Sequence, residues 1–145
     1  MRDLGMFVKS RGGTSLVVAE VGVDRGRNAY EMLYELNIER MYLIDHYLEY
    51  RDGMAGLVPQ NIQDEMYREM FRYLKNYFNK IVLVTKTSEF ASSLFSDEFF
   101  DFVYIDCNHD YESIKQDIDL WWPKVKVGGV FGGHDFDCGD IHDVS

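Results

Sequence analysis

Residues 101–136 read DFVYIDCNHDYESIKQDIDLWWPKVKVGGVFGGHDF, which predicts a strand, a polar loop, a helix, a turn and a second strand. The first apolar run ends at Asp106, and the second ends at His134 and Asp135. Buried strands that end abruptly in carboxylates and imidazoles deliver polar groups to one edge of a sheet, where open α/β sheets bind their ligands. The stretch therefore predicts a functional site at the carboxyl ends of parallel strands.

Upstream of this stretch, β-branched runs alternate with segments of helical periodicity. We expect strands at 15–21, 41–44, 80–84, 102–105 and 130–133, and helices at 28–36, 64–78, 88–95 and 111–122. Because crossovers between parallel strands are right-handed in nearly all proteins, the alternation predicts an α/β fold with a doubly wound, Rossmann-like and mostly parallel sheet. The polar residues 46–63 are expected to form a long binding loop or lid.

Length and composition predict a single domain over residues 1–145, since 46% of the residues are hydrophobic and 28% are charged. The net charge of −10 disfavours nucleic acid or an anionic membrane as the main partner, because such binding depends on basic residues. No run approaches the roughly 20 apolar residues of a membrane span, and the N-terminus lacks a signal-peptide core. Cys107 and Cys138 form no CxxC pair, so we expect a cytoplasmic protein.

Further candidate residues follow the strands at 15–21 and 41–44. In EVGVDRG, residues 20–26, the glycines let the backbone approach a ligand, and the next helix offers N–H groups to an anion. The spacing departs from the dinucleotide fingerprint, which favours a carboxylate-bearing ligand or a plain strand-to-helix turn over a pyrophosphate. Asp45 lies about twenty residues further on, where nucleoside sites place an acid that accepts ribose hydroxyls, although an Asp that begins a loop is the alternative.

From about Val17 onward, the chain resembles a class I S-adenosylmethionine-dependent methyltransferase. EVGVDRG resembles the first motif of that family, and YLID, residues 42–45, resembles its ribose-binding second strand. The 101–136 stretch resembles the methyltransferase type 24 branch of small-molecule O-methyltransferase-like proteins. The residues that agree in kind, order and spacing are Asp106, His109, Tyr111, Trp121-Trp122-Pro123, Gly128-Gly129 and Gly133-His134-Asp135.

The resemblance implies a role for each candidate residue. Asp45 would bind the ribose and Ser88 would touch the adenine edge, while His109 would act as the catalytic base together with Asp106. A divalent cation would bind Asp106, His134 and Asp135, although Mg²⁺ prefers oxygen ligands and His134 favours a softer ion or a position outside the direct ligands. The residues implied for S-adenosyl-L-methionine are Glu20, Gly22, Asp24, Gly26, Asn28, Asp45, Ser88 and Asp106.

The implied fold has strand order 3-2-1-4-5, and the implied function is methyl transfer to a small molecule, expected at oxygen and with a divalent metal. The family continues past strand five with a helix and an antiparallel strand pair, and this chain departs from that pattern after Asp135. The alternative is therefore a non-catalytic nucleoside- or S-adenosylmethionine-binding or assembly protein that pairs as a homo-oligomer through the strand-five edge. A nicotinamide-dependent enzyme is disfavoured because G-x-G-x-x-G is absent. Expected acceptor contacts are Tyr47, Tyr50 and Met54.

Overall fold

The computed structural model describes residues 15–52, 56–107 and 110–133, and the main sheet within them has five parallel strands. The order of the strands is β5-β2-β1-β6-β7, which confirms the expected 3-2-1-4-5 arrangement. The strands are β1 (Leu16–Val21), β2 (Ile38–Ile44), β5 (Ile81–Val84), β6 (Phe100–Ile105) and β7 (Val125–Gly133).

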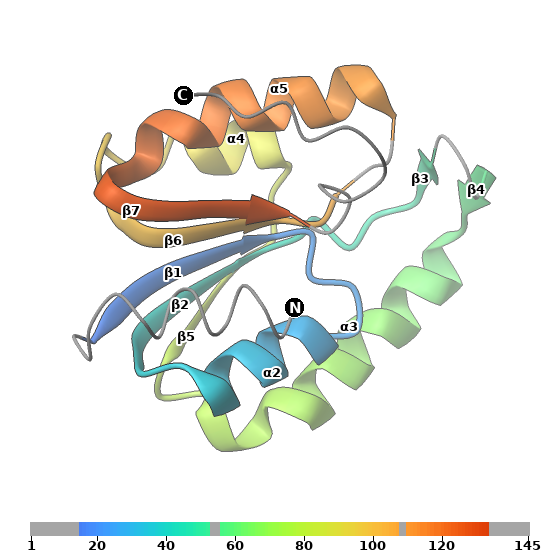
Figure 1. Cartoon of the computed structure of the whole chain (residues 1–145). Helices are drawn as coiled ribbons and strands as arrows, with labels where there is room; N and C mark the ends of the chain where they lie inside the picture. The colour runs from blue at the N-terminus through green and yellow to red at the C-terminus, as the bar shows by residue number, and fades with distance from the viewer. Residues whose placement is uncertain (1–14, 53–55, 108–109, 134–145) are drawn as a thin grey trace.

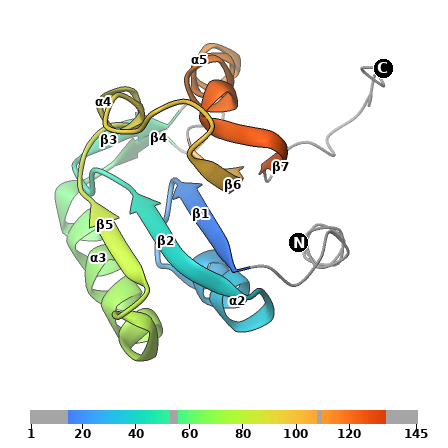
Figure 2. The same ribbon diagram turned by 90° about the vertical axis from the view of Figure 1, so that its left-hand side faces the viewer.

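Helices cover both faces of this sheet (Figure 1, Figure 2). One face carries α2 (Arg27–Glu35) and α3 (Gln60–Leu74), and the other carries α4 (Ser88–Ser92) and α5 (Tyr111–Trp121). Successive residues of a strand point to opposite faces, so Val18 packs in the core under α2 and α3 while Ala19 packs in the core beside Trp121. In the described ranges, no helix is both long and apolar enough to cross a membrane.

Capping side chains and 3₁₀ turns mark the ends of the helices. Thr87 caps α4, because its side-chain oxygen accepts a hydrogen bond from the Phe90 N–H at 3.3 Å. The expected helix at 111–122 ends at Trp121, and Pro123 falls in the 3₁₀ turn η2 (Trp122–Lys124) that leads into β7. The helix expected at 64–78 begins earlier, at Gln60, and passes into the 3₁₀ turn η1 (Lys75–Tyr77).

Two expected segments were wrong in part. Residues 46–63 are not a loop throughout, because β3 (Tyr50–Asp52) and β4 (Gly56–Val58) form an antiparallel pair beyond the carboxyl ends of the main strands (Figure 1). The last strand begins at Val125 rather than at 130, and Gly128, with φ +78°, lies inside it. The register moves from Phe100–Val125 to Phe102–Val130, so the glycines form a bulge and not the turn that we expected.

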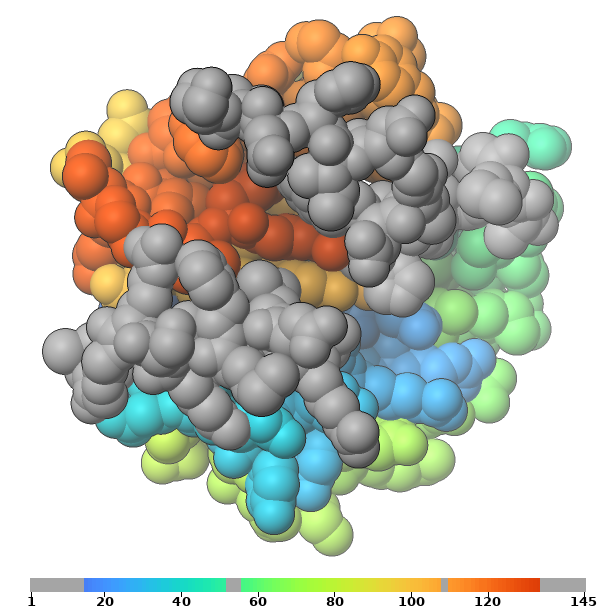
Figure 3. Space-filling view, in the orientation of Figure 1, coloured from blue at the N-terminus to red at the C-terminus, as the bar shows by residue number. Residues whose placement is uncertain are grey.

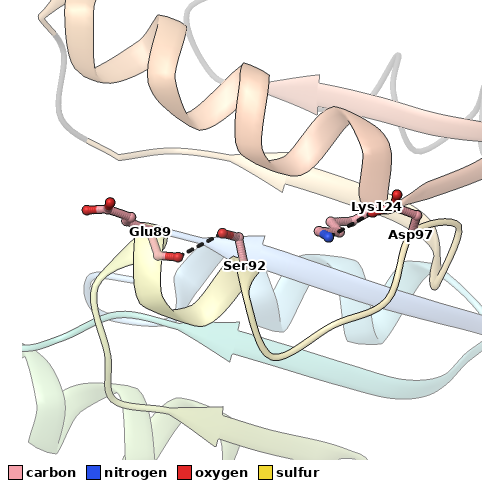
Figure 4. Close-up of polar contacts among 4 residues, drawn as sticks. All are labelled: Glu89, Ser92, Asp97 and Lys124. Atoms are coloured by element: carbon pink, nitrogen blue, oxygen red, sulfur yellow. Dashed lines mark hydrogen bonds and ion pairs between the residues drawn. The ribbon is translucent and has the colours of Figure 1, made fainter.

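The turn η2, which follows α5, is tied to the segment that follows α4 (Figure 4). The Lys124 Nζ lies 2.8 Å from the Asp97 Oδ1, and within α4 the Ser92 hydroxyl donates to the Glu89 carbonyl at 2.8 Å. The first contact joins two exposed or partly exposed groups and therefore orients the chain more than it stabilises the fold.

The ends of β1 and β6 approach each other more closely than a side chain would permit. Gly22, with φ +86°, follows β1, and a Cβ built on it would lie 2.0 Å from the Asp106 carbonyl oxygen and 2.9 Å from the Cys107 nitrogen. The Asp106 N–H donates to the Val21 carbonyl at 2.7 Å, which keeps the two strand ends in contact. A residue with a Cβ at position 22 would push the end of β6 away.

We expect Gly22→Ala to lower the free energy of unfolding by about 3 kcal/mol, from left-handed strain plus displacement of the β6 backbone. Gly56→Ala is the matched control, because Gly56 also has positive φ, +81°, but its Cβ would meet nothing within 4 Å. The control should cost about 1–2 kcal/mol, which is the strain alone. Urea unfolding measures both variants, and equal losses would show that the close approach at Gly22 is unimportant.

Candidate functional site

Carboxylates from three strands meet at the carboxyl edge of the sheet. Glu20 lies in β1 with Leu43 and Tyr104 as its register partners, while Asp45 and Asp106 directly follow β2 and β6. Asp24 adds a fourth acid from the segment after β1, and its charge, like those of Asp45 and Asp106, acts on Glu20. The structure therefore brings together four of the acids that the sequence singled out.

Glu20 is the buried centre of this group, with 0% of its surface exposed. Its Oε1 accepts a hydrogen bond from the Asn28 Nδ2 at 2.7 Å, whereas Oε2 is buried without a partner among the described residues. The Asn28 Oδ1 is likewise buried without a partner there. Burial raises the pKa of Glu20 well above its usual value, and the charges of Asp106, Asp45 and Asp24 raise it further against the opposing Asn28 bond.

Asp45 organises the segment of residues 22–26, which we call the cofactor loop after the role that the sequence analysis predicts for it. Its Oδ2 accepts from the N–H groups of Val23 at 3.0 Å and Asp24 at 3.1 Å, and its Oδ1 accepts from the Tyr47 N–H at 3.0 Å. A carboxylate offers about four acceptor positions, so about one remains for a ribose hydroxyl. Asp45 thus supports the loop, and its binding of a ribose stays a prediction.

The two glycines of the cofactor loop meet other parts of the chain. Gly22 packs on the end of β6, as described above. Gly26, with φ +75°, is the N-cap of α2, and a Cβ there would lie 3.0 Å from the Met70 Cγ of α3. Across the same contact, the Arg25 guanidinium pairs with the Glu69 carboxylate at 2.8 Å. In the space-filling view, the blue atoms that follow β1 lie beside the green atoms of α3 (Figure 3). Both glycines have a packing role, and their contact with a cofactor stays a prediction.

Tyr47 is buried, although we expected it to contact the acceptor. Only 6% of its surface is exposed, and its hydroxyl donates to the Asp24 carbonyl at 2.8 Å. Burial raises the pKa of Tyr47 above its usual range, and the nearby carboxylates of Asp45, Glu20 and Asp24 add to the shift. Tyr50 lies in β3, and Met54 lies outside the described residues.

Ser88 belongs to a polar network on the α4 and α5 side of the sheet. Its hydroxyl donates to the Asp117 carboxylate and accepts from the Trp121 indole N–H at 2.8 Å. The Cys107 thiol also bonds to Asp117, so the network reaches the end of β6. Because the hydroxyl proton of Ser88 is already donated, an adenine could use only its remaining lone pair.

Asp117 is the residue that the sequence analysis missed. It lies on the buried face of α5, four positions before Trp121, and is 6% exposed. That spacing of an acid and a tryptophan on one helical face was the available signal. Burial raises the pKa of Asp117, and the bonds from Ser88 and Cys107 oppose the rise. Burial, followed by the charge of Asp117, raises the pKa of the Cys107 thiol well above its usual value.

Three expected site residues, His109, His134 and Asp135, lie outside the described residues. The expected metal site therefore has only Asp106 in the described part of the chain. Within that part, no group of three or more His, Cys, Asp or Glu side chains is arranged to bind a metal ion.

The sequence was also compared with models of known protein families. Residues 13–136 match the family described as a methyltransferase domain. The chain belongs to the methyltransferase domain family. No curated protein sequence matches it.

Solved structures share the fold at low identity. The N-methyltransferase NodS from Bradyrhizobium japonicum, solved with S-adenosyl-L-homocysteine, is 16% identical, with a TM-score of 0.57 over 90% of this chain and 60% of its own. A second structure is a Burkholderia thailandensis 1,6-didemethyltoxoflavin-N1-methyltransferase, solved with 1,6-didemethyltoxoflavin and S-adenosylhomocysteine. It is 16% identical, and its TM-score is 0.58 for a match that covers 90% of this chain and 48% of that one. Spermidine synthase from Thermotoga maritima is 17% identical, with a TM-score of 0.62 for a match that covers 94% of this chain and 44% of the synthase. The chain thus spans 44–60% of the length of these three structures, whose similarity shows the fold.

We expect Asp117→Asn to make Cys107 react faster with iodoacetamide near pH 8, because losing the Asp117 charge lowers the pKa of the thiol. The measurement uses a Cys138→Ser background and follows the alkylation rate between pH 7 and 10. The midpoint of the rate profile should move to lower pH. Asp119→Asn, on the exposed side of α5, is the control and should leave the profile unchanged. A uniform acceleration at every pH would indicate loosened packing instead and would contradict the expectation.

Proposed function

We propose that this chain binds S-adenosyl-L-methionine at the carboxyl edge of its sheet and transfers the methyl group to a small-molecule acceptor, at oxygen. The observation that carries the proposal is the buried Oε2 of Glu20, which has no partner among the described residues and lies within a group of four acids. A buried acceptor without a donor costs free energy unless a ligand supplies one. Membership in the methyltransferase domain family supports this choice of ligand.

The residues of the edge fit the chemistry of this cofactor. It carries a positive sulfonium and an ammonium group, and an electronegative site rich in acceptors favours both. Glu20 and Asn28 would bind the methionyl end, Asp24 would lie near its amine, and Asp45 would accept one ribose hydroxyl. Gly22, Gly26, Ser88 and Asp106 complete the set that we propose for cofactor binding.

When bound, the cofactor supplies an electrophilic methyl group, which an oxygen nucleophile takes in line as the carbon–sulfur bond breaks. The chain's own part is to position the acceptor and to remove its proton. We assign the proton to His109, three positions beyond Asp106, and we place the acceptor on the side of the sheet edge where β3 and β4 lie (Figure 1).

The proposal also includes a divalent cation, which Asp106, His134 and Asp135 would bind. A cation there would lower the pKa of an acceptor hydroxyl and orient it. The described residues contribute Asp106 alone, so they do not by themselves make a metal site, and we assign no step to a metal.

The acidic balance of the chain, −10, supports a small molecule over nucleic acid or a membrane as the partner. We place the protein in the cytoplasm, since Cys107 and Cys138 form no CxxC pair and two cysteines make no disulfide framework.

A non-catalytic binding or assembly protein is the second candidate, and the edge of the sheet favours it. In the described part of the chain, β7 pairs only with β6, and Val127 on it is 89% exposed. An uncovered edge strand can pair with the same strand of a second copy, which would give a homo-oligomer.

We expect Glu20→Gln to weaken S-adenosylhomocysteine binding about 10- to 100-fold in calorimetric titration, because a charge-assisted contact to the ammonium group is lost. The same change should stabilise the fold increasingly as the pH rises. The folded-state pKa of Glu20 is raised, so its contribution to stability is present below its unfolded pKa and is lost as the pH rises through the folded value.

Glu31→Gln on the exposed side of α2 is the control and should change neither quantity. Failure of the folded wild-type chain to bind S-adenosylmethionine or S-adenosylhomocysteine at about millimolar concentration would rule out the proposed function.

We expect methyl transfer across a panel of phenolic and other hydroxyl-bearing acceptors, followed by formation of S-adenosylhomocysteine. His109→Ala and Asp106→Asn should each lower kcat by about 100-fold or more, as expected when a proton acceptor or a group that orients the nucleophile is lost. His109→Ala should still bind the cofactor, whereas Asp106→Asn should also bind it more weakly, since Asp106 belongs to the proposed cofactor-binding set. Cofactor binding without turnover on any acceptor would instead favour the non-catalytic candidate.

A further inference from the structure

The cofactor loop and the segment after β2 each contain a residue in the left-handed region. Asp24 and Tyr47 both have φ 50°. Among the described residues other than glycine, Glu98 is the only further one with positive φ. Residues with a side chain rarely adopt this conformation, and it persists only where the surroundings enforce it. Here the two are bonded to each other, since the Tyr47 hydroxyl donates to the Asp24 carbonyl at 2.8 Å.

The backbone groups of Tyr47 are also engaged, and each bonds a different part of the chain. Its N–H donates to the Asp45 Oδ1 at 3.0 Å, and its carbonyl accepts from the Gln60 Nε2 at 3.0 Å. Gln60 is the first residue of α3, and its Oε1 accepts from the Glu49 N–H at 3.0 Å. Gln60 thus bonds the chain immediately before β3, while it also begins the helix that follows β4.

The ring of Tyr47 is fixed between these partners. It packs edge-on against Tyr67 of α3, with ring centroids 4.9 Å apart, and lies in the same core as Met70. Its hydroxyl therefore reaches the cofactor loop from an anchored position. A change in the conformation of Asp24 would break the bond or move Tyr47, and with it the carbonyl that Gln60 binds.

We propose that Tyr47 is a positioning residue that couples the cofactor loop to the β3–β4 hairpin, so that a ligand bound at the loop orders the hairpin. By the hairpin we mean the antiparallel pair β3 and β4, which lies beyond the carboxyl ends of the main strands (Figure 1). A ligand that contacts the loop only in its Asp24 left-handed conformation selects the state in which the Tyr47 bond is made. This coupling rests on the proposed function, because the ligand is the cofactor.

Tyr47→Phe is the central test, because it removes one hydroxyl and keeps the packed ring. Hydrogen exchange of the β3 and β4 amides is measured on the full chain with and without saturating S-adenosylhomocysteine, whose affinity is measured by calorimetry. In the wild type, ligand should slow exchange in the hairpin. In Tyr47→Phe, affinity should fall about two- to tenfold and the ligand-dependent protection should be lost even at saturation. Tyr67→Phe, a neighbouring change of the same kind, should behave as the wild type.

Gln60→Ala breaks the coupling at its other end and keeps the hypothesis testable if Tyr47→Phe folds poorly. It should remove the hairpin protection and, because coupling is reciprocal, should lower the affinity for S-adenosylhomocysteine by about the same factor as ligand slows hairpin exchange in the wild type. Hairpin protection that persists in either folded variant, or that is absent in the ligand-bound wild type, would overturn the coupling while leaving cofactor binding intact. A wild type that binds no ligand would overturn the proposed function as well, and calorimetry separates these two outcomes.

Discussion

The buried carboxylate of Glu20 is the constraint to which the rest of the site responds. Removing an ionised carboxylate from water costs several kcal/mol unless partners replace the lost hydration, and Asn28 supplies one bond to one oxygen. Asn28 reaches Glu20 because Gly26, the last residue of the cofactor loop, is the N-cap of α2, which puts Asn28 in the first turn of the helix. The other acids of the edge oppose ionisation of Glu20 further. A cationic ligand reverses each of these effects, so the same residues that lower the stability of the ligand-free fold favour binding.

The cofactor loop has its conformation because neighbouring elements impose it. The Asp45 carboxylate accepts hydrogen bonds from two successive N–H groups of the loop, and the Tyr47 hydroxyl donates to the Asp24 carbonyl. Gly22, which has no Cβ, allows the end of β6 to pack against the loop. Each contact comes from a different element of the α/β fold. These contacts favour one conformation of the loop, so less entropy is lost when a ligand selects that conformation.

Most of the fold could be predicted from the sequence, because each main strand is an apolar run and each main helix has a clear stripe. The β3–β4 hairpin could not, because its three-residue strands carry no alternation long enough to recognise. The early start of β7 was hidden by Gly128 and Gly129, which are typical of turns but here form a bulge within a strand. Within the site, the acids at strand ends were predictable from position. The hydrogen-bond partners of Tyr47 and Asp117 were not predictable, because these partners are distant in sequence.

The glycines after β1 do not by themselves indicate a ligand site. Gly22 and Gly26 were assigned to a cofactor through the family resemblance, since from the residues alone a plain strand-to-helix turn was an equal alternative. In this structure both positions are already explained by positive φ and by contacts with β6 and α3. A glycine required by its own fold is uninformative about a ligand, since it would be present with or without one. Glu20 is different, because its second carboxylate oxygen is buried and has no donor in the part of the chain that the structure describes, so packing there does not account for it. The case for a cofactor at this edge therefore depends on the acid inside the strand and on the family of the chain, more than on the glycines that first suggest it.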